Sequence, residues 1–172
     1  LTTMKKTYSL WLIPAGGFYR QCVRRMKQLS RQYRAPNFLP HITLLGLIKG
    51  EEKTMVAHSA ELAEALPVLR LQIKTIVGGS QYHKSVFGRI KKQPALMAAH
   101  RRAKTIFAVP DGRQAAGKTP PYDPHLSFVY GQFDRRTKAA IKKFLHELIG
   151  SKFALDKLDL YLTDQPKPRA WR

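Results

Sequence analysis

The sequence is poor in cysteine, in acidic residues and in long apolar runs. Its one cysteine, Cys22, has no partner for an internal disulfide, which is typical of a reducing compartment, and we expect a cytoplasmic protein. No apolar run approaches the roughly 20 residues that a membrane-spanning helix needs, so no membrane association is expected. The first residues lack the apolar core of a signal peptide. Cys22 falls on an apolar helical stripe and is predicted to be buried.

The shortage of acidic residues gives the chain a large net charge, because 31 Lys and Arg face only 11 Asp and Glu, a balance of +20. Such an excess attracts polyanions and predicts salt-sensitive association with phosphate-bearing ligands. Nucleic acid or a nucleotide is therefore the expected class of partner. Five basic residues form one stripe along a predicted helix, which is either a solvated face or a track for non-specific RNA binding. They are Arg20, Arg24, Lys27, Arg31 and Arg34.

The length and the 44% hydrophobic content fit one domain, residues 1–172, and we expect a monomer. Periodicity and turn residues predict elements of alternating type. The strands are 8–13, 41–48, 69–77, 85–90, the segment from 125 and 155–162, and the helices are 19–34, 51–66, 94–108 and 135–150. The order strand, helix, strand, helix, strand thus occurs twice, in residues 8–78 and 84–172. Two equivalent units would face each other across a pseudo-twofold axis.

A short sequence motif around a histidine also occurs twice. The pattern P-x-[FY]-x-P-H-[IL]-[TS] fits both 36–43 and 120–127, with the two histidines 84 residues apart. On a strand, residues i and i+2 point to the same face. His41 therefore lies beside Thr43, and His125 beside Ser127. A third H-x-S sequence begins at His83 but lacks the proline, which shows that the short core alone is weak evidence.

Two histidines and two hydroxyls that converge on one cleft have a recognisable chemistry. One imidazole can act as a base while the other, protonated, acts as an acid. The hydroxyls of Thr43 and Ser127 can hold the oxygens of a phosphate. Neither phrase offers a cysteine, and Asp123 is the nearest carboxylate, so we expect no metal and no cofactor. The alternative is that His41 and His125 are ordinary strand histidines, which two matched copies argue against.

Other residues could border the same cleft. Trp11, on the first strand, either stacks on a base at the rim or is buried in the core. His83 enters the equivalent strand of the second half and could border the cleft. The segment 111–118, "DGRQAAGK", lacks the spacing of a phosphate-binding loop and is interpreted as a connector, from which Arg113 or Lys118 could reach substrate phosphates.

The two phrases, "PHITLLG" and "PHLSFVYG", resemble the paired signature of the 2H phosphoesterase superfamily. "YSLWLIP", "TPPYDPHLSFVYG" and the tryptophan of "PRAWR" are most similar to its plant and fungal cyclic phosphodiesterase branch. The 2′-5′ RNA ligase-like branch usually has an Ala-Arg pair where Val129-Tyr130-Gly131 stands here. The high charge, the single cysteine and a chain that stops one residue after Trp171 depart from the branch.

The resemblance implies an α+β fold, with two pseudo-symmetric lobes of antiparallel β-sheet, helices on the outer faces and a central cleft. It also implies metal-independent hydrolysis of nucleoside 2′,3′-cyclic phosphates or ADP-ribose 1″,2″-cyclic phosphate, with Tyr130 near the phosphate. Two alternatives remain open. One is an RNA-end enzyme that acts on 2′,3′-cyclic phosphate ends, ligates or trims oligonucleotides. The other is a basic nucleic-acid-binding protein without activity.

Overall fold

The computed structural model describes residues 5–109 and 120–163. The segment 111–118, with Arg113 and Lys118, lies outside these ranges, as does Trp171. The described elements follow the predicted order, and they are β1 (Lys6–Pro14), α1 (Gly16–Tyr33), β2 (Ile42–Gly50), α2 (Glu52–Ala65), β3 (Leu69–Gln81), β4 (Lys84–Ile90), α3 (Pro94–Ile106), β5 (His125–Val129), α4 (Arg135–Leu145), a 3₁₀ turn (His146–Leu148) and β6 (Lys152–Leu162). No helix within the described ranges is long and apolar enough to cross a membrane.

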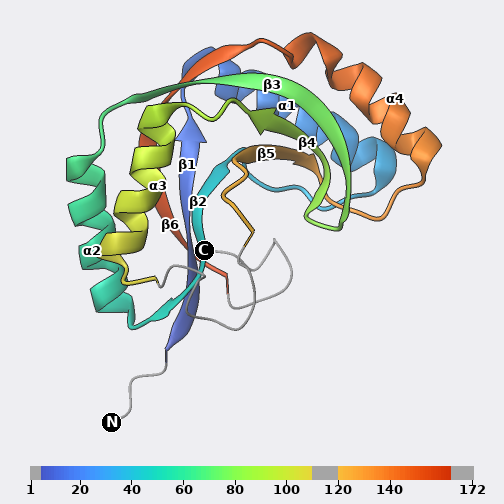
Figure 1. Cartoon of the computed structure of the whole chain (residues 1–172). Coiled ribbons are helices and arrows are strands. Elements are labelled where there is room, and N and C mark those ends of the chain that lie inside the picture. The colour runs from blue at the N-terminus through green and yellow to red at the C-terminus, as the bar shows by residue number, and fades with distance from the viewer. Residues whose placement is uncertain (1–4, 110–119, 164–172) are drawn as a thin grey trace.

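The six strands form one antiparallel ring in the order β1-β2-β5-β4-β3-β6 (Figure 1). The ring consists of two three-stranded lobes. In lobe A, β1 pairs with β2 and β6, and in lobe B, β4 pairs with β5 and β3. The lobes join through β3 with β6 and through a single register pair between β2 and β5, Ile42 with Leu126. This arrangement confirms the expected α+β fold of two antiparallel lobes.

The two halves of the chain exchange their last strands. The last strand of each half lies in the lobe that contains the first strand of the other half. β3 closes the half that begins at β1, yet it pairs along most of its length with β4. β6 closes the second half and pairs with β1 from Tyr8 to Pro14. Because element order and strand pairing are the same in both halves, we propose that 8–78 and 84–172 are two repeats of one unit within a single domain.

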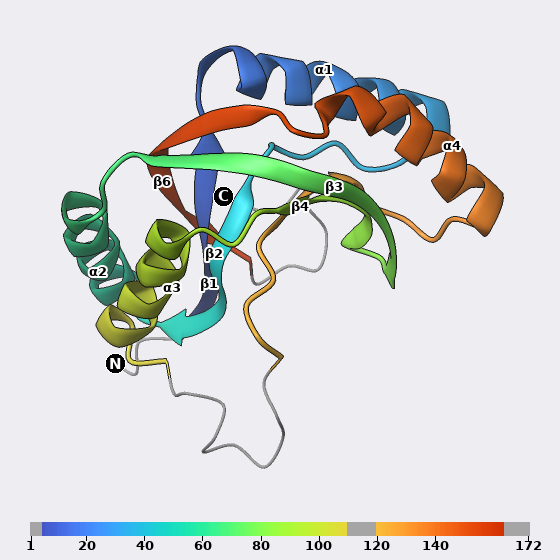
Figure 2. The same cartoon turned by 45° about the horizontal axis from the view of Figure 1, so that its top comes forward.

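The helices cover the outer faces of the lobes (Figure 2). α2 and α3 pack on lobe A, whereas α1 and α4 pack on lobe B. α1 buries Cys22, Met26 and Leu29, which recur at helical spacing, so the predicted burial of Cys22 is confirmed. Burial raises the pKa of the Cys22 thiol to about 12, which keeps it protonated at neutral pH. The helices and the outward faces of the strands thus share one apolar core.

The last predicted helix is shorter than expected. α4 begins where the Asp134 side chain accepts a hydrogen bond of 2.7 Å from the Thr137 N–H, as an N-cap does. It ends at Leu145 and continues as the 3₁₀ turn. Gly150, at φ +84°, then donates its N–H to the Ile73 carbonyl at 2.9 Å. This tertiary bond redirects the chain into β6, a contact that helical periodicity cannot reveal.

The β3–β4 hairpin depends on a glycine. A Cβ added to Gly79 would lie 2.2 Å from the backbone oxygen of Lys84, closer than any real Cβ contact. The obstacle is backbone of the same hairpin, so it cannot move aside as a flexible side chain would. Gly79 therefore permits the close approach that places His83 and Lys84 at the start of β4.

We expect Gly79→Ala to destabilise the protein by about 3 kcal/mol, because the hairpin must open to accept the methyl group. Urea unfolding followed by circular dichroism measures the change. Gly17→Ala is the control, since a Cβ there meets only the end of Arg20 at 3.8 Å in the first turn of α1. That control should leave stability unchanged or raise it by up to about 1 kcal/mol. Equal stability of the two variants would contradict the close approach.

Candidate active site

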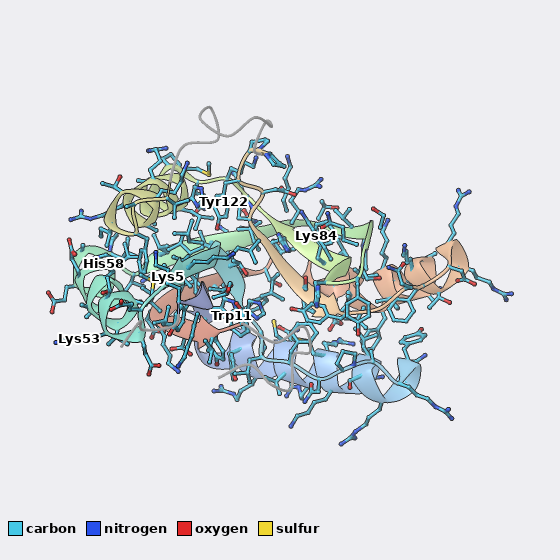
Figure 3. The ribbon with its side chains drawn as sticks, turned by 90° about the horizontal axis from the view of Figure 1, so that it is seen from below. Lys5, Trp11, Lys53, His58, Lys84 and Tyr122 are labelled. Carbon is cyan, nitrogen blue, oxygen red and sulfur yellow. The ribbon has the colours of Figure 1, made fainter. Side chains whose placement is uncertain are left out.

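One cavity of about 300 Å³ brings together residues from both lobes. Its lining comes from β1, from β2 and the residue before it, from the β3–β4 turn, from β5 and the residue after it, and from the residue that follows β6. Every candidate residue from the sequence that lies within the described ranges and was expected at the cleft lines it. The lining residues are Ser9, Trp11, His41, Thr43, Leu47, His83, His125, Ser127, Tyr130 and Thr163. Seen from below, Trp11 lies in the middle of the molecule, between the helix pairs that cover the two lobes (Figure 3).

The single pair that joins β2 to β5 places the two histidines side by side. Ile42 and Leu126, the register partners, each follow a histidine directly. In an antiparallel pair the next positions run in opposite directions, so His41 comes opposite Ser127 and Thr43 opposite His125. Ile42 and Leu126 are fully buried on the other face. The repeated phrase therefore meets its own copy.

Both histidines are held in the same way. The Nδ1 of His41 lies 2.7 Å from the carbonyl oxygen of Leu39, and that of His125 lies 2.8 Å from the carbonyl oxygen of Asp123. A carbonyl oxygen only accepts hydrogen bonds, so each Nδ1 carries the hydrogen and donates it. In the neutral imidazoles, Nε2 is therefore the atom that can take up a proton. Each ring is oriented by the residue two positions before it.

The surroundings of the two histidines differ. His41 is buried, and this burial lowers its pKa to about 4, against the opposing effect of its hydrogen bond to Leu39 and with a smaller contribution from the neighbouring His125. Burial also lowers the pKa of His125, which is only half-buried, while its hydrogen bond to Asp123 acts in the opposite direction. At neutral pH His41 is thus held as the neutral imidazole.

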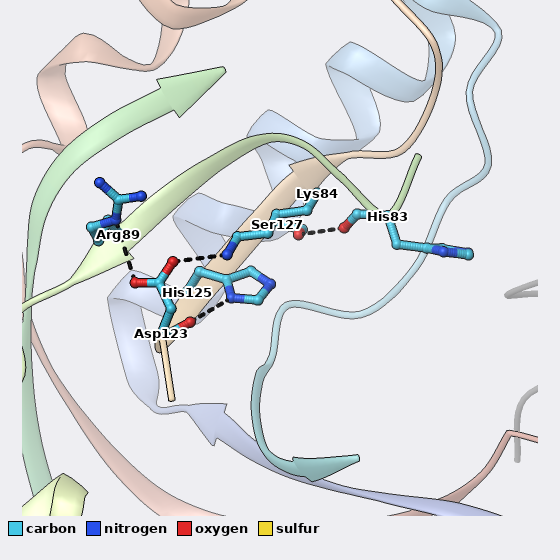
Figure 4. Close-up of polar contacts among 6 residues, drawn as sticks. All are labelled: His83, Lys84, Arg89, Asp123, His125 and Ser127. Atoms are coloured by element: carbon cyan, nitrogen blue, oxygen red, sulfur yellow. Dashed lines mark hydrogen bonds and ion pairs between the residues drawn. The ribbon is translucent and has the colours of Figure 1, made fainter. Parts of the chain in front are cut away.

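A charged cluster on β4 holds the residue that orients His125 (Figure 4). The Lys84 Nζ lies 2.8 Å from one carboxylate oxygen of Asp123, and the Arg89 Nε lies 3.4 Å from the other. Both cations lower the pKa of the Asp123 carboxyl, although partial burial opposes them, so it stays ionised. His41 has no such cluster behind it, since Leu39 takes the place of Asp123. The sequence repeat predicted the two histidines but not this asymmetry.

The hydroxyl of Ser127 is engaged in the structure. Its Oγ donates a hydrogen bond of 2.8 Å to the carbonyl oxygen of His83 (Figure 4). Thr43 lines the cavity, and its own carbonyl accepts a hydrogen bond of 3.0 Å from the Tyr122 hydroxyl. The segment that leads into β5 is thereby tied to β2.

Trp11 lines the cavity, but both faces of its ring are covered. His41 stacks on one side, with ring centroids 3.6 Å apart, and Tyr161 stacks with its ring centroid 3.8 Å away. The side chain is only 3% exposed. Of the two alternatives for Trp11, the structure favours burial over a stacking platform for a base. Its contact instead fixes the plane of the His41 ring.

Tyr130 and His83 form the opposite wall. Tyr130 stacks on Phe38, with ring centroids 3.7 Å apart, and the edge of His83 approaches it with centroids 4.9 Å apart. Burial raises the pKa of the Tyr130 hydroxyl, so this hydroxyl remains a proton donor at neutral pH. His83, whose pKa burial lowers, borders the cavity as the sequence suggested.

Sequence reasoning missed Ser9, Leu47 and Thr163 in the lining and Asp123 behind it. Ser9 could have been found, because it shares a strand face with Trp11 two residues on. Thr163 reaches the cavity only because β6 pairs with β1. The Thr163 N–H donates a hydrogen bond of 2.8 Å to the carbonyl oxygen of Thr7. Among the described residues, no three His, Cys, Asp or Glu side chains are grouped so that they could hold a metal ion.

Known proteins resemble this chain in sequence and in fold. The family described as cyclic phosphodiesterase-like protein matches residues 4–172. A cyclic phosphodiesterase of Arabidopsis thaliana is 25% identical over 166 residues, which cover 93% of this chain and 87% of that protein. Two structures of E. coli LigT each cover 98% of this chain and 93% of LigT. The apo form has a TM-score of 0.58 at 15% identity, and the complex with 3′-AMP has 0.61 at 11%.

The pKa of His41 predicts how stability depends on pH. An unfolded chain has a histidine pKa near 6.5, whereas the folded value is about 4, so the unfolded state binds the proton more readily. The folded state is then fully stabilised above pH 6.5 and loses stability as pH falls towards 4. Between pH 7.5 and 4.5 we expect His41→Asn to lose about 2.5 kcal/mol less than the wild type.

Urea unfolding at the two pH values measures this difference. His146→Asn is the control, because His146 is exposed in the 3₁₀ turn, and it should lose as much stability as the wild type. A loss in His41→Asn as large as in the wild type would show that His41 does not titrate as a buried group.

Proposed function

We propose a specific reaction for this chain, which belongs to the cyclic phosphodiesterase-like family and is a cyclic phosphodiesterase. The resemblance of its two histidine phrases indicated the same activity. It opens five-membered cyclic phosphates, either nucleoside 2′,3′-cyclic phosphates or ADP-ribose 1″,2″-cyclic phosphate, by a two-histidine mechanism without a metal. The observation that carries the proposal is the placement of His41 and His125 in one cavity, each with Nδ1 held by a carbonyl.

The unequal surroundings support unequal roles. His41, neutral at pH 7, takes a proton from water through Nε2 as the oxygen of that water attacks phosphorus. The ester bond on the far side of phosphorus breaks, and His125 gives the proton of its Nε2 to the departing ribose oxygen. Burial and the charges of Lys84 and Arg89 lower the pKa of His125, while the hydrogen bond to the Asp123 carbonyl and the Asp123 carboxylate favour the protonated form that this step requires. The product is a phosphomonoester, and both histidines return to their starting states by exchanging protons with solvent.

The hydroxyls supply the charge stabilisation. Thr43 and Ser127, opposite the histidines in the register, hold the non-bridging oxygens of the phosphate, and Tyr130 donates from the opposite wall. Ser127 must turn its hydrogen from the His83 carbonyl towards the phosphate, a rotation about one bond. The burial of Tyr130 suits it to this role because its hydroxyl keeps its proton.

We expect His41→Ala and His125→Ala each to lower the kcat for 2′,3′-cyclic AMP by about 10²- to 10⁴-fold in the presence of EDTA, because each removes one proton transfer. Unchanged circular dichroism shows that the fold survives, and His146→Ala is the control with wild-type turnover. Near-normal turnover of the double variant would sink the mechanism. The fall of kcat/KM on the alkaline side should persist in His41→Ala and vanish in His125→Ala, and the reverse result would exchange the two roles.

A second candidate, an RNA end as the substrate, is favoured by where the charge lies. α1 carries no acidic residue, and Arg24, Lys27 and Arg31 on it are exposed and line one shallow surface depression. α2, on lobe A, instead carries three glutamates. The basic excess is thus concentrated over lobe B, where it could hold the backbone of a strand whose 2′,3′-cyclic end enters the cavity. The 3′-AMP bound to LigT shows that a protein of this fold can hold a nucleotide.

An oligonucleotide with a 2′,3′-cyclic phosphate end tests this candidate against 2′,3′-cyclic AMP at about 50 and 200 mM salt. We expect neutralising α1 to raise the KM for the oligonucleotide about tenfold, to weaken its salt dependence and to leave 2′,3′-cyclic AMP unaffected. The triple variant is Arg24→Gln/Lys27→Gln/Arg31→Gln, and the control of equal charge on lobe A is Lys53→Gln/Arg101→Gln/Arg102→Gln. If the two triple variants changed the KM for the oligonucleotide equally, the effect would be one of overall charge, and α1 would not be a specific binding surface for RNA.

A further inference from the structure

Leu47 has a backbone conformation that its residue type rarely adopts. Its φ is +56°, in the left-handed region. The other described residues of this kind besides glycine are Arg34 and Ala108, at φ +51° and +50°. Arg34 caps α1 and Ala108 follows α3, and a left-handed residue is ordinary at the end of a helix. Leu47 lies inside β2, so the end of a helix cannot account for it.

A β-bulge produces this conformation. Along the β1–β2 pairing, Tyr8 is opposite Ile48 and Leu10 is opposite Leu45, so Gly46 and Leu47 together face the single residue Ser9. Bulges redirect side chains and are common beside active sites. Here the bulge turns Leu47 out of the core, since its neighbours Leu45 and Ile48 are buried while Leu47 is 82% exposed.

The exposed side chain borders the catalytic cavity. Leu47 is one of the residues that line it, and it is the most exposed large apolar residue of the described chain. The aromatic residues of the lining are already engaged. Trp11 is stacked on both faces, and Tyr130 has Phe38 on one face and the edge of His83 nearby. A flat apolar ligand that enters the cavity therefore finds Leu47 as the uncovered apolar surface at its rim.

We propose that Leu47 is the residue that contacts the nucleobase of the substrate, so that the site selects nucleoside 2′,3′-cyclic phosphates. The inference rests on the proposed function and resolves one choice within it. In a nucleoside 2′,3′-cyclic phosphate, the ribose that bears the cyclic phosphate also bears a base on C1′. In ADP-ribose 1″,2″-cyclic phosphate, the corresponding carbon bears the phosphate oxygen, and that ribose has no base. The first substrate can place the base of that same ribose on Leu47 while its cyclic phosphate reaches the histidines, whereas the base of ADP-ribose 1″,2″-cyclic phosphate is the adenine at the far end of its diphosphate.

Two variants remove the apolar side chain while remaining compatible with the left-handed backbone conformation of this position. Leu47→Gly adopts the left-handed region freely, and Leu47→Asn tolerates it while keeping a side chain of similar length. We expect each to raise the KM for 2′,3′-cyclic AMP about 3- to 10-fold, with little change in kcat, because the lost contact is the burial of an apolar side chain against the base. The KM for ADP-ribose 1″,2″-cyclic phosphate should not change.

The melting temperature supplies a second readout. Leu47→Gly should melt about 3 °C higher than the wild type, because it relieves the unfavourable backbone. Ala108→Gly is the matched control, since it relieves a similar φ at a residue that is not part of the cavity lining and should leave both KM values unchanged. A residue retained only for the fold would instead lower the melting temperature when it is replaced.

The outcomes separate the two proposals. Equal KM changes for both substrates, or none for either, in enzyme that still turns them over would overturn the role of Leu47 and leave the proposed function standing. Preference of the wild type for ADP-ribose 1″,2″-cyclic phosphate would likewise overturn the selection of nucleosides. Hydrolysis of neither substrate by the wild type would overturn the proposed function itself and the role of Leu47 with it.

Discussion

The site depends on one strand contact, the pair between Ile42 of β2 and Leu126 of β5. It is the single register pair between these strands, and it closes the ring between the two lobes on the side of the cavity. Because each partner directly follows a histidine, the contact brings His41 to Ser127 and His125 to Thr43. A slip by one residue would turn the histidines to the opposite face, so the apolar core that buries Ile42 and Leu126 also sets the geometry of the candidate active site.

The near symmetry of the two halves is broken in the surroundings of the two histidines. Both imidazoles are held by a carbonyl two residues earlier, but Asp123 adds a carboxylate held by Lys84 and Arg89, whereas Leu39 adds none. Trp11 covers one face of the His41 ring. One histidine is thus neutral and buried, and the other lies beside ionised groups. The repeated phrase supplies two imidazoles, and their unequal neighbours suit the base and acid roles that we propose for them.

The lining of the cavity combines rigid and exposed parts. Stacked aromatic rings, Trp11 with Tyr161 and Tyr130 with Phe38, hold the walls in place. The rim is formed by the bulge of β2, where an apolar side chain points to solvent from a left-handed backbone. Such a conformation persists only where surrounding structure maintains it, and the two flanking strand pairs of β1 do so here.

The sequence by itself determined the element order, the burial of Cys22 and the two histidines and two hydroxyls that meet in the cavity, because these follow from local periodicity and from the repeated phrase. It could not determine which strand pairs with which. The exchange of β3 and β6 between the halves, and with it the position of Thr163, arises from contacts between residues far apart in the chain. The ion pairs of Asp123, the covered faces of Trp11 and the bulge at Leu47 were also decided by the tertiary structure. Each of these features depends on which residues packing brings together across a strand pair, and the spacing of residues along the chain does not predict those contacts.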